Sequence, residues 1–142
     1  MKLRKVLVTM PVDAGYKERF AGTLPGAEFT YARYDELTPE QLASFDAAVG
    51  DPAPGALSKL SGLRLLQLNS SGVPADCLTL RDSHPGLVLC STSGAFGQAI
   101  SEHMAAALLM LMKRLHTYRD AMKQGAWQSL GKVVSPRGMQ VL

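Results

Sequence analysis

One stretch decides how the rest of the chain is interpreted: residues 91–127, STSGAFGQAISEHMAAALLMLMKRLHTYRDAMKQGAW. Its apolar side chains recur every three or four residues, which places them on one face of a helix: Ile100, Met104, Ala107, Leu108, Leu111, Leu115, Tyr118 and Met122. No proline interrupts the run, and Gly125 supplies a stop signal. The pattern predicts one helix about 40 Å long. Such a helix is longer than a small domain needs, so we expect it to lead from one domain to another.

The middle of this helix has no polar face. Every residue from Met104 to Met112 is apolar, and a helix that is apolar all round is expected to be buried on all sides. The run is too short to cross a bilayer, which needs about 20 apolar residues. We therefore expect its own domain on one side and a second domain or subunit on the other. The alternative, a central helix of one compact domain, stays open.

The composition indicates a folded protein. The chain has 142 residues, of which 46% are hydrophobic, enough for a domain with a core. No signal peptide is visible, and the apolar run after Lys5 stops at Pro11. The two cysteines, Cys77 and Cys90, lack the spacing of a metal site. These features predict reduced cysteines and a cytoplasmic protein without a membrane partner.

The charge is unevenly placed along the chain. Up to Glu102 there are nine Lys and Arg against eleven Asp and Glu, and from His103 onward there are six against one. A basic segment can bind nucleic acid. Here the charges are scattered and lack interleaved aromatic residues, which favours a solvated surface. We expect no nucleic-acid partner.

Upstream of this stretch, apolar segments alternate with helix candidates. The expected strands are 5–10, 28–32, 47–50, 63–68 and 87–90, and the expected helices or helical turns are 14–24, 56–60, 74–78 and one that begins after Thr38. Thr38-Pro39-Glu40-Gln41 reads as a capping box with proline at the first helical position. This alternation predicts an α/β domain with a parallel sheet.

Three loops are expected at the carboxyl ends of the strands, where open parallel sheets bind ligands. They are 11–14, 69–73 and 91–97, and the last two are rich in Ser, Thr and Gly. Backbone N–H groups in such loops can hold a carboxylate or a phosphate. The same composition is usual in short connections between a strand and a helix, so a purely structural role stays open.

The sequence contains no complete catalytic constellation. The glycine patterns of dinucleotide-binding turns, phosphate-binding loops and serine hydrolases are missing. Glu102-His103 has no second His at helical spacing, so no metal site is predicted. A phospho-receiver domain would need an acidic pair after the first strand, and only Asp13 is available.

Three strings together resemble the D-isomer-specific 2-hydroxyacid dehydrogenases. They are LRLLQLNSSGVPAD at 63–76, STSGAFGQAISEHMAAALLMLMKRL at 91–115 and GAW at 125–127. The resemblance implies a flavodoxin-like parallel sheet with helices on both faces, followed by a long interdomain helix and the start of a Rossmann domain. Residues 1–98 would be the substrate-binding domain. Residues 99–142 would be the interdomain helix and the beginning of the NAD-binding domain. Residues 138–142 resemble the first strand of that domain.

The resemblance also implies a function. The chain would be the N-terminal part of an NAD(P)-dependent D-2-hydroxyacid dehydrogenase or 2-keto acid reductase, with NAD or NADP as cofactor. The substrate would be a small 2-keto or 2-hydroxy acid, such as glyoxylate or hydroxypyruvate, and the enzyme would be a homodimer. The family's catalytic Arg, Glu and His and its glycine-rich NAD motif match nothing in these residues, so no catalytic residue is assigned. The chain alone is expected to be inactive.

Two sets of site residues follow from the resemblance. The first resembles the loop whose backbone N–H groups hold the substrate carboxylate: Ser70, Ser71, Gly72 and Val73. The second resembles positions that border the nicotinamide: Ile100, Ser101 and Met104. Glu102 and His103 match a helix-opening pair that we interpret as structural. Pro74 stands where the family usually has Asp.

A second hypothesis belongs to another class. The chain could be a stand-alone flavodoxin-like binding or dimerisation module without catalysis. The apolar face between Ile100 and Met122 would then be its pairing surface.

Overall fold

The structure is a computed structural model that describes residues 2–53 and 55–140. The chain divides into two compact units, Met1–Ala95 and Phe96–Leu142. The predicted domain boundary, between residues 98 and 99, lies a few residues beyond this division. The two units are described separately below.

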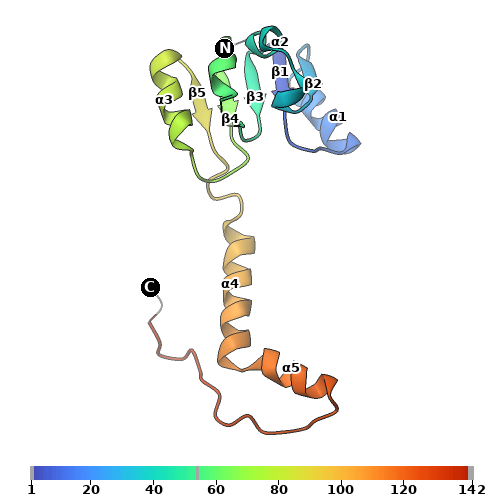
Figure 1. Ribbon diagram of the computed structural model, residues 1–142, viewed down its shortest axis with the longest axis vertical. Coiled ribbons are helices and arrows are strands. Elements are labelled where there is room, and N and C mark those ends of the chain that lie inside the picture. Colours follow the sequence, from blue (N-terminus) through green and yellow to red (C-terminus); the bar gives the residue numbers. More distant parts are fainter. Residues whose placement is uncertain (1, 54, 141–142) are drawn as a thin grey trace. The chain divides into compact units, whose positions relative to one another are not determined.

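The first unit is built on a five-stranded sheet (Figure 1). Its strands are β1 (Lys5–Val8), β2 (Glu28–Tyr31), β3 (Ala47–Val49), β4 (Leu65–Gln67) and β5 (Val88–Cys90). All neighbouring strands pair in parallel, in the order β2-β1-β3-β4-β5. This is the flavodoxin-like order. The prediction of a parallel α/β sheet is confirmed.

Short helices connect these strands. They are α1 (Ala14–Thr23), η1 (Tyr34–Glu36), α2 (Pro39–Ala43), η2 (Leu57–Lys59) and α3 (Ala75–Ser83), where η marks a 3₁₀ helix. The predicted capping box at Thr38 is present, because its hydroxyl accepts from Gln41 N and Gln41 Oε1 accepts from Thr38 N at 2.8 Å. The predicted turn 74–78 is instead a helix that continues to Ser83.

The first unit has a core on each face of the sheet, because successive residues of a strand point to opposite faces. Leu7, Ala48 and Leu66 belong to one core, which α2, η2 and α3 complete with apolar side chains: Leu42, Leu57, Cys77 and Leu80. Val6, Val8 and Ala47 belong to the other, against which Phe20 and Leu24 from the α1 segment pack. Helices therefore cover both faces, as predicted.

The second unit begins with α4 (Gly97–Met112) and α5 (Leu115–Lys123), so the prediction of one continuous helix is wrong. The break lies at Arg114, whose φ of 54° is left-handed. That conformation costs a side-chain-bearing residue about 1–2 kcal/mol. Contacts with a distant segment offset this cost: the Arg114 guanidinium donates to Leu130 O, and Val134 N donates to Met112 O at 3.1 Å. At 1.5 Å per residue, α4 is about 24 Å long.

The predicted stop at Gly125 is confirmed. Gly125 has a φ of 69°, its N–H donates to Met122 O, and Ala126 N donates to Ala121 O, each at 3.0 Å. These two bonds form the paired closing pattern that glycine commonly gives to the end of a helix.

The predicted burial of α4 against a second domain or subunit stays a prediction, because the structure is that of one chain. No side chain of α4 is buried, and Ile100, Met104 and Leu111 are 55%, 63% and 59% exposed. Because α4 belongs to the second unit, it is not the central helix of one compact domain. No helix among the described residues is both long and apolar enough to cross a membrane.

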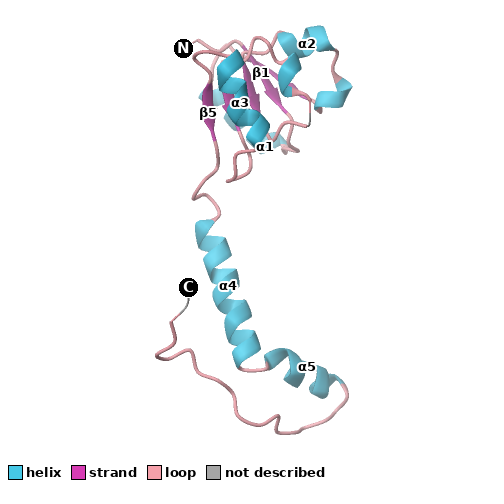
Figure 2. Ribbon diagram, turned by 60° about the vertical axis from the view of Figure 1, so that its left-hand side comes forward, coloured by secondary structure: helices cyan, strands magenta, loops and turns pink. Residues whose placement is uncertain are grey.

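The chain after α5 is irregular over residues 124–140 (Figure 2). The predicted first strand of a Rossmann domain is therefore not formed in the described part of that segment, and Val141 and Leu142 lie outside the described residues.

Candidate functional site

The candidate site lies where the parallel strands end. Three connections follow β3, β4 and β5 and begin at Gly50, Leu68 and Ser91. Because β3, β4 and β5 are adjacent and parallel, these connections share the carboxyl edge of the sheet. This edge carries the predicted carboxylate loop, residues 69–73.

Asp51 connects two of these loops. Its Oδ1 atom accepts hydrogen bonds from Asn69 N at 3.0 Å, from Ser70 N at 3.1 Å and from Ser70 Oγ at 3.0 Å. The carboxylate therefore holds the first two residues of the loop after β4.

Gly50 allows the backbone just before Asp51 to lie close to the end of β1. Its φ is 119°, and a Cβ at this position would lie 2.2 Å from Thr9 Oγ1 at the end of β1. Its N–H donates to Gln67 O at 2.9 Å. The backbone at Gly50 therefore lies close both to Thr9, just after β1, and to Gln67, the last residue of β4. Only glycine combines this backbone conformation with this closeness.

The same loop is held from its other side by Thr92. The Thr92 hydroxyl donates to Asn69 O at 2.8 Å, and Thr92 N donates to Ser70 O at 3.1 Å. Ser70 Oγ also lies 2.8 Å from Gly72 O, so its hydroxyl hydrogen is shared between this carbonyl and Asp51. The first half of the loop is thus fixed by hydrogen bonds within the chain.

The second half of the loop offers free donors. Among the residues that the structure describes, the backbone N–H groups of Ser71, Gly72 and Val73 have no acceptor, and all three residues are exposed. Free backbone N–H groups can donate hydrogen bonds to an anion. Of the four predicted loop residues, Ser70 has its N–H committed to Asp51, and the other three have theirs available.

Gly72 and Pro74 have local roles that the structure defines. A Cβ at Gly72 would meet no atom within 4 Å, and its φ is not left-handed. Its small size is therefore not required by the rest of the chain. Pro74 precedes the first residue of α3 and makes no side-chain cap.

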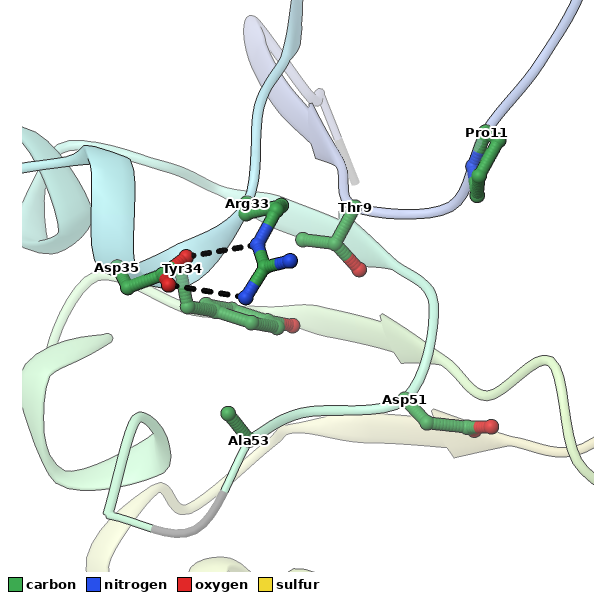
Figure 3. A pocket seen from close by; sticks show the side chains of 7 residues that line it. All are labelled: Thr9, Pro11, Arg33, Tyr34, Asp35, Asp51 and Ala53. Atoms are coloured by element: carbon green, nitrogen blue, oxygen red, sulfur yellow. Dashed lines mark hydrogen bonds and ion pairs between the residues drawn. The ribbon is translucent and has the colours of Figure 1, made fainter.

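A pocket of about 400 Å³ adjoins Asp51 (Figure 3). It is lined by Thr9, Pro11, Arg33, Tyr34, Asp35, Asp51 and Ala53. Arg33 Nε and Nη2 donate to the two carboxylate oxygens of Asp35 at 3.0 and 2.9 Å. This bond to Arg33 lowers the pKa of the Asp35 carboxyl, and the bond to Asp35 raises the pKa of Arg33. The guanidinium charge in the pocket is therefore already compensated.

Tyr34 contributes a buried hydroxyl to this pocket. The residue is 8% exposed, and its hydroxyl has no hydrogen-bonding partner among the described residues. Burial raises the pKa of Tyr34 to about 12, an effect that the nearby Thr9 side chain opposes. The phenol is thus neutral at physiological pH.

The predicted nicotinamide-facing residues lie on α4. Ile100 and Met104 are four residues apart, which places them on one face of the helix. Ser101 Oγ donates to Gln98 O at 2.8 Å, so its hydroxyl hydrogen is engaged within the helix. Glu102 Oε1 accepts from Gln98 Nε2 at 3.0 Å, and its structural role stays a prediction. The described residues contain no cluster of His, Cys, Asp and Glu that could hold a metal ion.

Asp51 was not recognised from the sequence, where Asp51-Pro52-Ala53-Pro54 indicates only a turn. The available signal was an acidic residue directly after a short buried strand. Its significance depends on β3 lying beside β4, which the sequence does not state.

Comparison with solved structures places this fold among known proteins. A D-isomer-specific 2-hydroxyacid dehydrogenase family protein from Aeromonas salmonicida matches 96% of this chain with a TM-score of 0.75 and 25% identity, over 44% of its own length. D-lactate dehydrogenase from Aquifex aeolicus, solved with NAD and lactic acid, matches 93% with a TM-score of 0.73 and 16% identity, over 40% of its length.

A third similar structure is the D-isomer-specific 2-hydroxyacid dehydrogenase from Xanthobacter autotrophicus, solved with NADPH and MES. It matches 91% of this chain with a TM-score of 0.60 and 21% identity, over 42% of its length. No protein-family model and no curated protein matches the sequence.

These matches agree with the resemblance carried by residues 63–76 and 91–127. Their aligned parts contain the same parallel α/β fold, and this chain spans less than half of the length of each of these structures. The chain resembles the D-isomer-specific 2-hydroxyacid dehydrogenases in sequence motifs and in fold, over that part of their length.

Proposed function

We propose that this chain supplies the carboxylate-binding part of an NAD(P)-dependent D-2-hydroxyacid dehydrogenase or 2-keto acid reductase. The observation that carries the proposal is the row of free N–H groups at Ser71, Gly72 and Val73. These donors bind one carboxylate of a small 2-keto or 2-hydroxy acid, of the size of glyoxylate or hydroxypyruvate. N–H donors to a carboxylate form charge-assisted bonds, which are stronger than neutral ones.

The loop binds the substrate without first rearranging. Asp51 and Thr92 fix Asn69 and Ser70 through hydrogen bonds within the chain. Little conformational entropy is then lost on binding, so weak individual bonds add up to useful orientation of the acid. The loop presents the carboxylate in one orientation, and the reacting carbon next to it is positioned with it.

The cofactor in this proposal is NAD or NADP, which supplies the hydride. Ile100 and Met104 fit a role beside the nicotinamide, because they are exposed apolar side chains on one face of α4. Ser101 fits less well, since its hydroxyl hydrogen is bonded to Gln98 O. The sequence assigns no catalytic acid, base or orienting Arg, and we expect the 142-residue chain alone to be inactive.

We also propose that the chain forms a homodimer through the apolar face of α4. Exposed apolar residues follow this face: Ile100, Met104, Leu108 and Leu111. An apolar surface of this extent favours association. Reduced Cys77 and Cys90 fit a cytoplasmic setting. Leu108→Lys should shift the chain toward monomer in sedimentation velocity, whereas Lys113→Glu should not, and equal behaviour of the two variants would argue against this surface.

The carboxylate site can be tested by NMR on the ¹⁵N-labelled chain. Titration with pyruvate should shift the amide signals of Ser71, Gly72 and Val73 with saturation. The matched neutral ligand, pyruvamide, should leave them unchanged, because it lacks the charge. Saturable shifts that occur elsewhere, or equal shifts with both ligands, would refute the site.

A kinetic assay addresses the expected inactivity. The chain is mixed with glyoxylate, hydroxypyruvate or pyruvate and with NADH or NADPH, and absorbance at the nicotinamide band is followed. No turnover is expected. Turnover by the chain alone would show that the catalytic groups are present in it.

A further inference from the structure

We propose that Asp51 is the positioning and specificity-determining residue of the anion loop, and that it restricts the loop to monocarboxylates whose remaining part carries no negative charge. The inference rests on the proposed carboxylate binding by Ser71, Gly72 and Val73. It adds a selectivity that follows from the arrangement of charges around the loop.

The positioning role follows from the hydrogen bonds of the carboxylate. One oxygen of Asp51 receives both N–H groups of Asn69 and Ser70 as well as the Ser70 hydroxyl. The loop therefore turns around this oxygen, and the next three N–H groups remain for a ligand. Without the carboxylate, the N–H groups of Asn69 and Ser70 would become additional competing donors, and only the bonds from Thr92 would hold the start of the loop.

The specificity role follows from the charge of the same group. Asp51 accepts hydrogen bonds from the loop and also lines the adjoining pocket. A ligand held by the loop therefore has the negative charge of Asp51 beside it. Among the described residues that line the pocket, Arg33 is the only cation, and Asp35 already binds it through two hydrogen bonds. A second carboxylate or a phosphate on the ligand would therefore meet like charge without a free partner.

The size of the effect can be bounded from electrostatics. A second negative charge several ångströms from Asp51, at the protein surface, weakens binding by about tenfold at low ionic strength. Salt screens this repulsion, so the discrimination should shrink to about twofold at 1 M NaCl. A steric mechanism would not depend on salt in this way.

The test compares two ligands that differ by one charged group. D-lactate is a monocarboxylate, and tartronate carries a second carboxylate in place of the methyl group. Amide signals of Ser71, Gly72 and Val73 in the 142-residue chain give the affinity of each. We expect the wild-type chain to bind D-lactate about tenfold more tightly than tartronate at low salt.

Two variants separate the two roles of the side chain. Asp51→Asn keeps the size and one acceptor oxygen but removes the charge, and it should reduce the difference between the ligands to about twofold. Asp51→Ala removes the acceptor too. It should speed amide exchange of Asn69 and Ser70.

Asp46 provides a matched control. Its Oδ2 atom accepts from Arg4 N at 2.8 Å and from Lys5 N at 3.0 Å, just before β3 rather than just after it. Asp46→Ala also removes a carboxylate from two backbone donors. It should alter stability but leave the ratio of the two ligand affinities unchanged.

The outcomes are distinguishable. If the wild-type loop binds neither ligand, the proposed carboxylate site fails and the inference fails with it. If D-lactate binds but Asp51→Asn leaves the ratio unchanged, the specificity role of Asp51 is overturned while the proposed function stands. If amide exchange of Asn69 and Ser70 in Asp51→Ala is like that of the wild type, the positioning role is overturned. Should Asp51→Ala not fold, Asp51→Asn still decides the specificity role.

Discussion

Asp51 and Ser70 are joined by two hydrogen bonds across the ends of neighbouring strands. The Asp51 Oδ1 atom lies 3.1 Å from Ser70 N and 3.0 Å from Ser70 Oγ, although the residues are 19 positions apart in the sequence. This contact fixes the start of the loop after β4, whereas the N–H groups of Ser71, Gly72 and Val73 have no acceptor among the described residues.

The closeness of β1 and β3 at this edge predicts a strong effect at Gly50. A Cβ there would lie 2.2 Å from Thr9 Oγ1 and would sit on a left-handed backbone. Gly50→Ala should therefore lower the free energy of unfolding by about 2–4 kcal/mol, measured by urea denaturation. Adding Thr9→Ala should recover part of the loss, because the contact with Oγ1 disappears and the backbone strain remains.

The matched control for that experiment is Gly72→Ala. A Cβ at Gly72 would meet nothing within 4 Å, so its cost should be below about 0.5 kcal/mol. Equal losses in the free energy of unfolding of the two variants would contradict the close contact between position 50 and Thr9.

Gly72 should matter for the ligand rather than for the fold. Gly72→Val adds a branched side chain beside an N–H group proposed to bind the substrate carboxylate. We expect the melting temperature to change little, since the space around Gly72 is open. The affinity for D-lactate should fall about threefold or more, because the valine limits close approach of the anion. Unchanged affinity would mean that the ligand does not reach Gly72.

The buried hydroxyl of Tyr34 predicts a pH effect at the alkaline end. The pKa of Tyr34 is raised to about 12 from 10.0. A group whose pKa is raised by folding contributes stability below its unfolded pKa and loses it as the pH rises through the folded value. The wild type should therefore lose about 2–3 kcal/mol between pH 10 and pH 12 through this residue.

Tyr34→Phe tests this effect in denaturation curves between pH 7 and pH 12. The variant should lack that component of the alkaline loss. At pH 7 it should be as stable as the wild type within about 1 kcal/mol, because the hydroxyl has no partner to lose. Tyr16→Phe, at an exposed position, should keep the wild-type pH dependence. A parallel loss in the wild type and in Tyr34→Phe would contradict the burial effect.

The break between α4 and α5 predicts distinct effects of two substitutions at Arg114. Glycine tolerates the left-handed φ of 54° but cannot donate to Leu130 O, and alanine has neither property. Both variants should speed hydrogen exchange at Val134 N, which bonds to Met112 O. Arg114→Gly should retain protection at Tyr118 N, which bonds to the carbonyl of residue 114, whereas Arg114→Ala should lose part of it. Exchange at Val134 like that of the wild type in both variants would show that Arg114 does not hold the segment.

Local patterns in the sequence predicted much of the first unit. Alternating apolar segments indicated the five strands and their parallel arrangement, since each is followed by a helix or a turn. The capping box at Thr38 and the stop at Gly125 were predictable because their hydrogen bonds join residues only a few positions apart.

Periodicity misled the prediction at α4 and α5. The apolar spacing continues through Lys113 and Arg114, and nothing local signals a break. The break at Arg114 occurs where a distant segment bonds to this part of the chain: the Arg114 guanidinium donates to Leu130 O, and Val134 N donates to Met112 O. The apolar spacing along one segment does not show which residues of a distant segment will form hydrogen bonds with it.

The sequence by itself determined the class of the fold, the position of the loop 69–73 and the small residues that leave its backbone accessible. The tertiary structure alone decided which of those N–H groups are available. Asp51 takes the N–H groups of Asn69 and Ser70 because β3 and β4 pair in parallel and end together, with Gly50 allowing the close contact with Thr9. The physical reason is that hydrogen bonds depend on distance in space, and only the folded sheet brings these donors and this acceptor within 3.1 Å.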